Sequence, residues 1–321
     1  MTDTETMLPD GLLLSALQMT EATAIAAAAH RGRGDEPAAM AAASRMLLAE
    51  LDRLEADGRI MVGDSAMDEE RLMVGSSVGA GGPRIDLAVN PLEGATLCAK
   101  ALPNALSAVV MGLPDRLLSV PDVYMEKIAI GPGYPDGIVD LDAAPADNLA
   151  ALAEAKGVQP KDLTVCVLDR PRHGTLIAAL RETGAAVRLI SDGDISAVIE
   201  TARADLTGLD IYMGVGGAPE GLIAAAALRC MGGQMQARLT PLNTDQRQLV
   251  AASGLDPQRK YRADELAAGD IVFSATGISG GALLRGVLSD AKGIHTHTLA
   301  MRSARGSVRW IASQHKGLPV A

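Results

Sequence analysis

The pattern of apolar and polar positions divides the chain into two regions with different rhythms. In the first region, alanine-rich segments with helical periodicity at 12–31 and 37–56 precede short apolar runs at 59–62 and 84–89. The segment 105–112 is the expected strand partner of the second run. Long helices mixed with neighbouring strands predict an α+β first half.

Farther along, strands and helices alternate, which is typical of parallel βαβ units. The expected strands are 163–169, 186–191 and 209–217, and the expected helices are 147–157, 173–184, 194–203 and 219–233. Late strands are expected at 270–274 and, as a hairpin, at 294–312. We therefore divide the chain into 1–150 and an α/β domain at 151–321, and the membership of the hairpin stays open.

Composition narrows the classes of function. Hydrophobic residues make up 48% of the chain and aromatic residues only 2%, so an aliphatic core is expected. A net charge of −10 disfavours a nucleic-acid partner. The three cysteines, Cys98, Cys166 and Cys230, form no CxxC pair and favour reduced thiols. No run approaches the ~20 apolar residues of a membrane span, so we expect a cytoplasmic protein without a membrane partner.

Charged and glycine residues follow three consecutive predicted strands. Arg170-Pro171-Arg172 follows the first, Asp192-Gly193-Asp194 the second, and Gly216-Gly217 with Glu220 the third. In α/β sheets, ligands bind beyond the carboxyl ends of strands. Arginines suit phosphate, aspartates suit sugar hydroxyls, and a glutamate at a helix start suits a metal. The set predicts a phosphorylated sugar or polyol as ligand, whereas each residue alone is equally consistent with surface solvation or helix capping.

The stretch DLAVNPLEGATL, residues 86–97, carries a second candidate site. A strand delivers Asn90, a turn at Pro91 is expected to point Glu93 back, and Gly94-Ala95-Thr96 open a helix whose free N–H groups could hold a phosphate. Phosphate monoester hydrolysis uses divalent metals, for which carboxylates are natural ligands. An ordinary strand-to-helix turn capped by asparagine is the alternative.

Three weaker signals leave alternatives open. The string GVGGAPEG lacks the GxGxxG spacing of a dinucleotide loop. His295 and His297 share one face of a predicted strand and could hold zinc, but no third ligand is apparent and exposed strand histidines are favoured. The acidic segment with Asp64 and Asp68 is either solvated or in contact with a metal.

Several strings in combination resemble one family. GRGD, DVYMEKIAIGP, DLDAAPADNL, LDRPRH, ISDGD, GVGGAPEG and FSATGIS are similar to strings of the class II fructose-1,6-bisphosphatases, relatives of the lithium-sensitive sugar phosphatases, over about residues 18–315. The resemblance implies a layered αβαβα sandwich of two domains with the site in the cleft between them. It also implies hydrolysis of the 1-phosphate of fructose 1,6-bisphosphate with Mn²⁺ or Mg²⁺, in a homo-oligomer, either a dimer or a tetramer.

The resemblance also implies roles for individual residues. The implied substrate contacts are Gly94, Ala95, Tyr124, Arg170, Pro171, Arg172, Asp192, Gly193, Asp194 and Gly217. The implied metal ligands are Asp64, Asn90, Glu93 and Glu220. Catalytic roles are implied for Asp68 and Glu93, and for Ala95 at the position of a family threonine.

Departures from the family pattern concentrate on the metal side. Met40 and Asn90 stand where the family has aspartates, Asp64 and Ala66 stand for glutamates, and Ala95 stands for threonine. Removing one preorganised electrostatic group can cost ~100- to 1000-fold in rate. The expectation is therefore a phosphatase that is weakened on its metal side, unless nearby acidic residues rebuild the ligand set. The alternative is an inactive sugar-phosphate binder or a regulatory subunit that assembles with an active paralogue.

Overall fold

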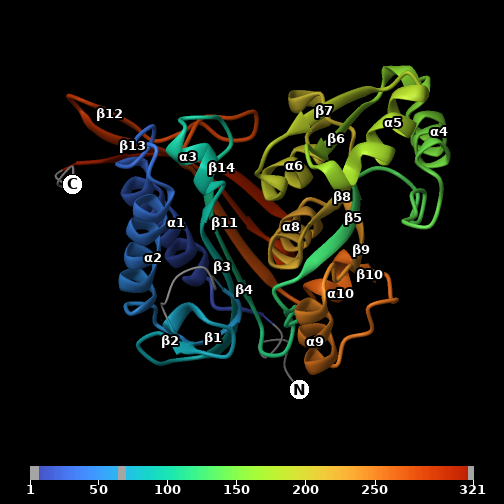
Figure 1. Ribbon diagram of the computed structural model, residues 1–321. Coiled ribbons are helices and arrows are strands. Elements are labelled where there is room, and N and C mark those ends of the chain that lie inside the picture. Colours follow the sequence, from blue (N-terminus) through green and yellow to red (C-terminus); the bar gives the residue numbers. More distant parts are fainter. Residues whose placement is uncertain (1–6, 64–69, 317–321) are drawn as a thin grey trace. The chain divides into compact units, whose positions relative to one another are not determined.

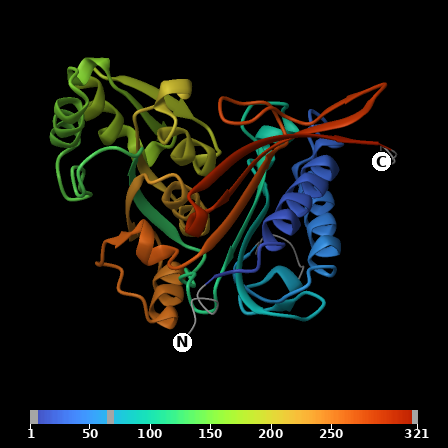
Figure 2. The same cartoon turned by 180° about the vertical axis from the view of Figure 1, so that it is seen from behind.

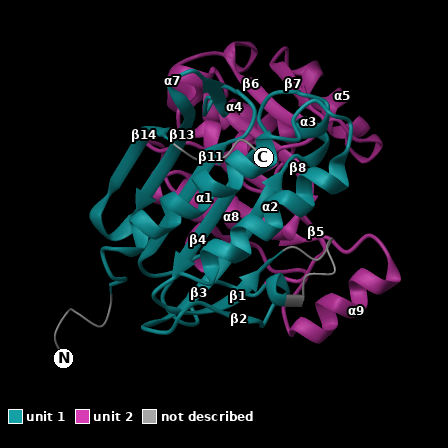
Figure 3. Ribbon diagram, turned by 90° about the vertical axis from the view of Figure 1, so that its left-hand side faces the viewer, with its two compact units in different colours: residues 1–119, 267–321 teal, residues 120–266 magenta. Residues whose placement is uncertain are grey.

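The computed structural model describes residues 7–63 and 70–316. They form two compact units, which are coloured separately in Figure 3: unit 1 comprises 1–119 and 267–321, and unit 2 comprises 120–266. This division differs from the expected domains 1–150 and 151–321. Segment 120–150 belongs with unit 2, and the late strands, including the hairpin, belong with unit 1.

Unit 1 is a mixed sheet covered by helices (Figure 1). Its helices are α1 (Leu12–Ala28), α2 (Glu36–Leu51) and the short α3 (Ala95–Ala99). Its strands are β1 (Asp57–Val62), β2 (Ser77–Val78), β3 (Arg84–Glu93), β4 (Leu106–Gly112), β11 (Ile271–Gly277), β12 (Leu288–Asp290), β13 (Gly293–Arg302) and β14 (Ser307–His315). They lie in the order β12-β13-β11-β4-β3-β1-β2, with β14 paired to β13.

The pairings of unit 1 explain how segments distant in the sequence share one sheet. Strand β4 pairs antiparallel with β3, as predicted, and also with β11, which pairs with β13. The predicted hairpin is confirmed as β13 and β14, which run antiparallel and are seen clearly from behind in Figure 2. Helix α1 buries Leu12, and helix α2 buries Leu47 and Leu51. These leucines share a core with Leu87 and Val109 of the sheet. Burial of these aliphatic side chains stabilises the unit.

Unit 2 contains a second sheet, in the order β10-β9-β5-β8-β6-β7. Its strands are β5 (Tyr124–Ile130), β6 (Thr164–Leu168), β7 (Ala186–Ile190), β8 (Ile211–Gly217), β9 (Gln234–Leu239) and β10 (Tyr261–Arg262). Its helices are α4 (Pro145–Lys156), α5 (Gly174–Glu182), α6 (Asp194–Thr201), α7 (Ala204–Thr207), α8 (Ala218–Cys230), α9 (Thr244–Ser253) and α10 (Ala263–Leu266).

The expected parallel βαβ arrangement is confirmed for β6 with both β7 and β8. Strand β5, by contrast, pairs antiparallel with both β8 and β9. Alternate residues of β5 enter different surroundings, as strand geometry requires. Ile128 and Ile130 pack with Leu149 and Leu180 of α4 and α5. Lys127, which directly precedes Ile128 on this strand, is also buried.

The structure confirms the expected mixed α/β class, with two sheets and packed helices. Its strands and helices coincide with most predicted segments because apolar periodicity reports burial, and burial selects the element. Within the described part of the chain, no helix combines the length and the apolar character that crossing a membrane would need.

Candidate functional site

The strand ends of unit 2 bring the predicted sugar-phosphate residues close together. The register of the antiparallel pair places Tyr124, the first residue of β5, opposite Gly217, the last residue of β8. Arg172, which follows β6, donates to the carbonyl of Val215 from Nε at 3.1 Å and from a terminal nitrogen at 2.7 Å. The loops after β6 and β8 and the start of β5 are therefore joined at one edge of this sheet.

Arg172 is held in a fixed orientation although it is exposed. Its guanidinium carbon lies 4.7 Å from the centroid of the Tyr124 ring, so the cation stacks on an aromatic face. The paired bonds to Val215 use one edge of the guanidinium fork. An arginine restrained in this way loses little entropy when its remaining N–H groups bind a phosphate.

His173 supports this arrangement from the interior. Its Nδ1 lies 2.7 Å from the carbonyl of Leu168, and its Nε2 accepts a hydrogen bond from the amide of Val215 at 2.8 Å. These two bonds assign the neutral tautomer with the proton on Nδ1. Burial lowers the pKa of His173, and the cations of Arg172 and Arg170 act in the same direction. In the sequence, this histidine is apparent only as the last residue of the string LDRPRH.

The Asp192-Gly193-Asp194 turn opens α6. Gly193 adopts the left-handed conformation, with φ of 87°, and its amide donates to the carboxylate of Asp192 at 2.9 Å. Asp194 is buried, and its carboxylate accepts from the ammonium group of Lys127 and from the Tyr212 hydroxyl at 3.4 Å. All three turn residues thus have a side chain or backbone group fixed by bonds within unit 2.

Glu220 stands in the first turn of α8, as the sequence predicted. Desolvation, together with the nearby Asp194 carboxylate, raises the pKa of Glu220 to about 7, and the Lys127 ammonium opposes this shift. A carboxyl group with a pKa raised in this way is partly protonated near neutral pH, and a bound cation would favour its ionised form.

In unit 1, Asn90 and Glu93 are adjacent through a local irregularity of β3. The ladder with β4 runs to Asn90 opposite Ala108 and resumes at Glu93 opposite Leu106. The predicted sharp turn at Pro91 is therefore wrong: the strand continues to Glu93 through a register shift, where a proline is tolerated. Asn90 Nδ2 donates to Glu93 Oε2 at 2.9 Å, which fixes the amide.

Gly94 then reverses the chain into α3. Its φ of 75° is left-handed, which a glycine adopts without the penalty of a side chain. The GRGD turn docks on the far end of this helix, because Gly32 and Gly34 donate to the carbonyls of Cys98 and Ala99, each at 2.9 Å. Asp35 caps α2 by accepting from the Ala38 amide at 2.9 Å. These contacts bring α2 and α3 together.

Two residues that stand where the resemblance implies polar residues are packing residues. Met40 of α2 and Ala95 of α3 both pack against one apolar cluster, which includes Ala39, Leu92 and Leu97. A thioether is a poor ligand for hard cations, and alanine has no ligand atom. This corner of unit 1 therefore contributes apolar contacts where the resemblance implies an aspartate and a threonine.

The metal requirement is met only in part by the described residues. Asn90 and Glu93 supply an amide oxygen and a carboxylate, which fit one divalent cation of the oxygen-preferring kind. Within ranges 7–63 and 70–316, no group of three or more His, Cys, Asp or Glu side chains is arranged to hold a metal. The predicted residues Asp64 and Asp68 lie outside the described residues.

The two strand histidines have partners of their own. His295 Nε2 is 3.1 Å from Asp290 Oδ1, and His297 Nδ1 accepts a hydrogen bond from the Arg285 amide.

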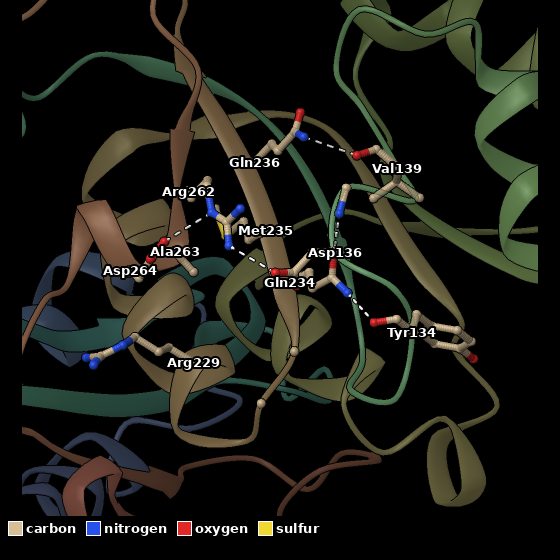
Figure 4. A pocket seen from close by; sticks show the side chains of 13 residues that line it. Tyr134, Asp136, Val139, Arg229, Gln234, Met235, Gln236, Arg262, Ala263 and Asp264 are labelled. Atoms are coloured by element: carbon tan, nitrogen blue, oxygen red, sulfur yellow. Dashed lines mark hydrogen bonds and ion pairs between the residues drawn. The ribbon is translucent and has the colours of Figure 1, made fainter. Parts of the chain in front are cut away.

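A cavity of about 300 Å³ in unit 2 is lined by other residues (Figure 4). Arg262 lies between Asp136, at 3.7 Å, and Asp264, at 3.3 Å. Gln234 and Gln236 bond to the backbone of the loop that contains Tyr134 and Val139. No predicted site residue is part of this lining, whose polar groups largely bond to one another.

The structure adds Lys127 and His173 to the residues predicted from sequence. A lysine inside the mostly apolar segment MEKIAI was the available signal, because lysine is almost never fully buried without a partner. Together, the strand ends define an α/β protein with a fixed arginine and a glycine-rich turn suited to phosphate esters.

Comparison with known proteins identifies the family. Residues 10–315 match the family model described as bacterial fructose-1,6-bisphosphatase, glpX-encoded. A protein of Synechococcus sp. (strain JA-3-3Ab), named D-fructose 1,6-bisphosphatase class 2/sedoheptulose 1,7-bisphosphatase, is 38% identical over 94% of each chain. The Escherichia coli (strain K12) protein named fructose-1,6-bisphosphatase 1 class 2 is 36% identical over 93% of each chain. The chain belongs to the class II fructose-1,6-bisphosphatase family.

Proposed function

We propose that this chain is a phosphoric monoester hydrolase that removes the 1-phosphate of fructose 1,6-bisphosphate. Membership of the family over residues 10–315 supports the reaction class. The observation that carries the substrate is the fixed arginine of unit 2, where Arg172 stacks on Tyr124 and is braced by Val215. That guanidinium is therefore preorganised to bind a phosphate ester.

In this proposal, unit 2 binds the sugar and its non-reacting phosphate. Arg170, Pro171 and Arg172 provide the phosphate contacts beside Tyr124. The Asp192–Asp194 turn and Gly217 provide contacts to the sugar through groups whose positions are already fixed. Binding energy from these groups would orient the reacting phosphate.

Unit 1 supplies the groups for the reacting phosphate. Gly94 and Ala95 open α3 toward it, and Asn90 and Glu93 offer oxygen ligands for a divalent cation, which we propose to be Mn²⁺ or Mg²⁺. A divalent cation, when bound, neutralises phosphate oxygens and lowers the pKa of an attacking water. Asp64 and Glu220 are further proposed metal ligands, and Asp68 is the proposed partner of the water. Ala95 has no hydroxyl that could orient this water. We therefore expect poor orientation of the water to lower the rate.

The test is release of inorganic phosphate from fructose 1,6-bisphosphate, with Mn²⁺ and Mg²⁺ each titrated to millimolar levels and EDTA as control. Metal-dependent release, reduced strongly in Arg172→Ala, supports the proposal. Binding of fructose 6-phosphate without any metal-dependent release would overturn hydrolysis and identify the chain as a sugar-phosphate binder.

We also propose that the chain assembles as a homo-oligomer, either a dimer or a tetramer. Light scattering of the purified protein measures this directly. A monomeric mass at micromolar concentration would contradict it.

A further inference from the structure

Lys127 is a buried cation at the centre of unit 2. Only 1% of its side chain is exposed, and it lies in β5 between Glu126 and Ile128. Moving an ammonium group out of water is costly unless it is paired and hydrogen-bonded. A lysine in this position therefore has a specific set of partners, and those partners indicate its role.

The ammonium group connects two segments of the candidate site. Lys127 Nζ donates to the carboxylate of Asp194, at the start of α6, and to the carbonyl of Gly217, at the end of β8, at 3.1 Å. The Tyr212 hydroxyl donates to the same Asp194 carboxylate at 3.4 Å. The Asp194 carboxylate is thus engaged within the protein.

The backbone beside this group is shaped around it. A Cβ on Gly216 would collide with the Asp194 carboxylate and lie 2.9 Å from Lys127 Nζ. A Cβ on Gly217 would collide with the carboxylate of Glu220. The paired glycines of GVGGAPEG therefore let two carboxylates and the ammonium approach the backbone, which explains this string without a dinucleotide.

We propose that Lys127 is a positioning residue for sugar-phosphate binding. By holding the Asp194 side chain and the Gly217 carbonyl, it sets the distance between the Asp192–Gly193 turn and the end of β8. Asp194 therefore acts through its contact with Lys127, and the ligand contacts backbone groups of the turn. The inference rests on the proposed function, because it concerns the residues that are proposed there to bind the sugar.

The test measures the affinity for fructose 6-phosphate by calorimetry in EDTA, beside the melting temperature. Lys127→Met alone leaves Asp194 as an unpaired buried charge and is expected to lower the melting temperature. The double variant Lys127→Met/Asp194→Asn removes that charge and is expected to recover most of the stability. We expect its Kd to stay tenfold or more above that of the natural chain, because the contacts of Lys127 with Asp194 and Gly217 are absent.

A matched control is available in the same unit. Lys156 and Asp210 form another lysine–aspartate pair, with side chains 36% and 5% exposed, at the end of α4 and beside β8. Lys156→Met/Asp210→Asn should leave the Kd within about twofold of the natural value while changing the melting temperature comparably.

Two results would overturn the inference, and they are distinguishable. A stable Lys127→Met/Asp194→Asn protein that binds fructose 6-phosphate as tightly as the natural chain would show that Lys127 serves stability alone. Absence of binding by the natural chain itself would remove the proposed substrate, and the inference with it.

Discussion

At the scale of single residues, Arg172 has its geometry fixed by two different kinds of contact. Stacking on Tyr124 and the paired bonds to Val215 both depend on a planar guanidinium. Lysine at this position keeps the charge but has neither the plane nor the fork. The role of this residue therefore depends on its shape as well as on its charge.

Arg172→Lys is expected to raise the KM for fructose 1,6-bisphosphate by about tenfold, equivalent to roughly 1.4 kcal/mol, with a smaller effect on kcat. Steady-state phosphate release measures both constants. Arg181→Lys, on the exposed side of α5, is the control and should leave KM unchanged. An unchanged KM in Arg172→Lys would show that the stacked, forked geometry does not matter for binding.

His173 predicts a pH dependence of stability. Burial lowers its pKa in the folded chain, so below the unfolded value of about 6.5 the unfolded chain binds the additional proton. The free energy of unfolding should therefore fall as pH decreases from 7 to 5, by at most about 1.4 kcal/mol per pH unit from this group. Urea unfolding at several pH values measures the slope. His173→Gln should reduce that slope, and an identical slope in both proteins would contradict the assignment.

At the scale of elements, the periodic segments were predictable and the exceptions have identifiable causes. Helices α1, α2 and α8 and strands β6 and β8 follow from apolar periodicity. Strand β5 was not assigned, because Glu126 and Lys127 interrupt its apolar run and Lys127 is buried only through partners distant in the sequence. Strand β9 alternates glutamines with apolar residues, and local pattern does not reveal what those glutamines bind.

The glutamines of β9 predict a stabilising function for this strand. Gln236 Nε2 donates to the carbonyl of Val139 at 3.1 Å, and its Oε1 accepts from the amide of Leu141 at 3.0 Å. Gln236→Ala leaves both backbone groups without these bonds and should lower the free energy of unfolding by ~1–3 kcal/mol.

Urea unfolding tests this prediction, with Gln248→Ala on the exposed surface of α9 as control. Equal stability of the two variants would show that the loop of Val139 is held by other contacts.

At the scale of the whole molecule, sequence predicted the class of fold and the family, whereas the compact units required the structure. The pairing of β4 with β11 joins segments more than 150 residues apart in the numbering, and no local pattern encodes it. The same limit applies to the candidate site. The residues after β6, β7 and β8 could be expected at one sheet edge, but the packing of Met40 and Ala95 into one apolar cluster could not.

We infer that this family member has the residues expected to bind the sugar phosphate, whereas Met40, Asn90 and Ala95 stand where the resemblance implies two aspartates and a threonine on the metal side. The most direct measurement compares phosphate release from fructose 1,6-bisphosphate, with Mn²⁺ titrated, by the natural chain and by Met40→Asp/Asn90→Asp/Ala95→Thr. We expect slow, metal-dependent release by the natural chain, and kcat raised by ~100-fold or more in the variant with KM within about threefold. A folded variant with no gain in kcat, or a natural chain without metal-dependent release, would contradict the account.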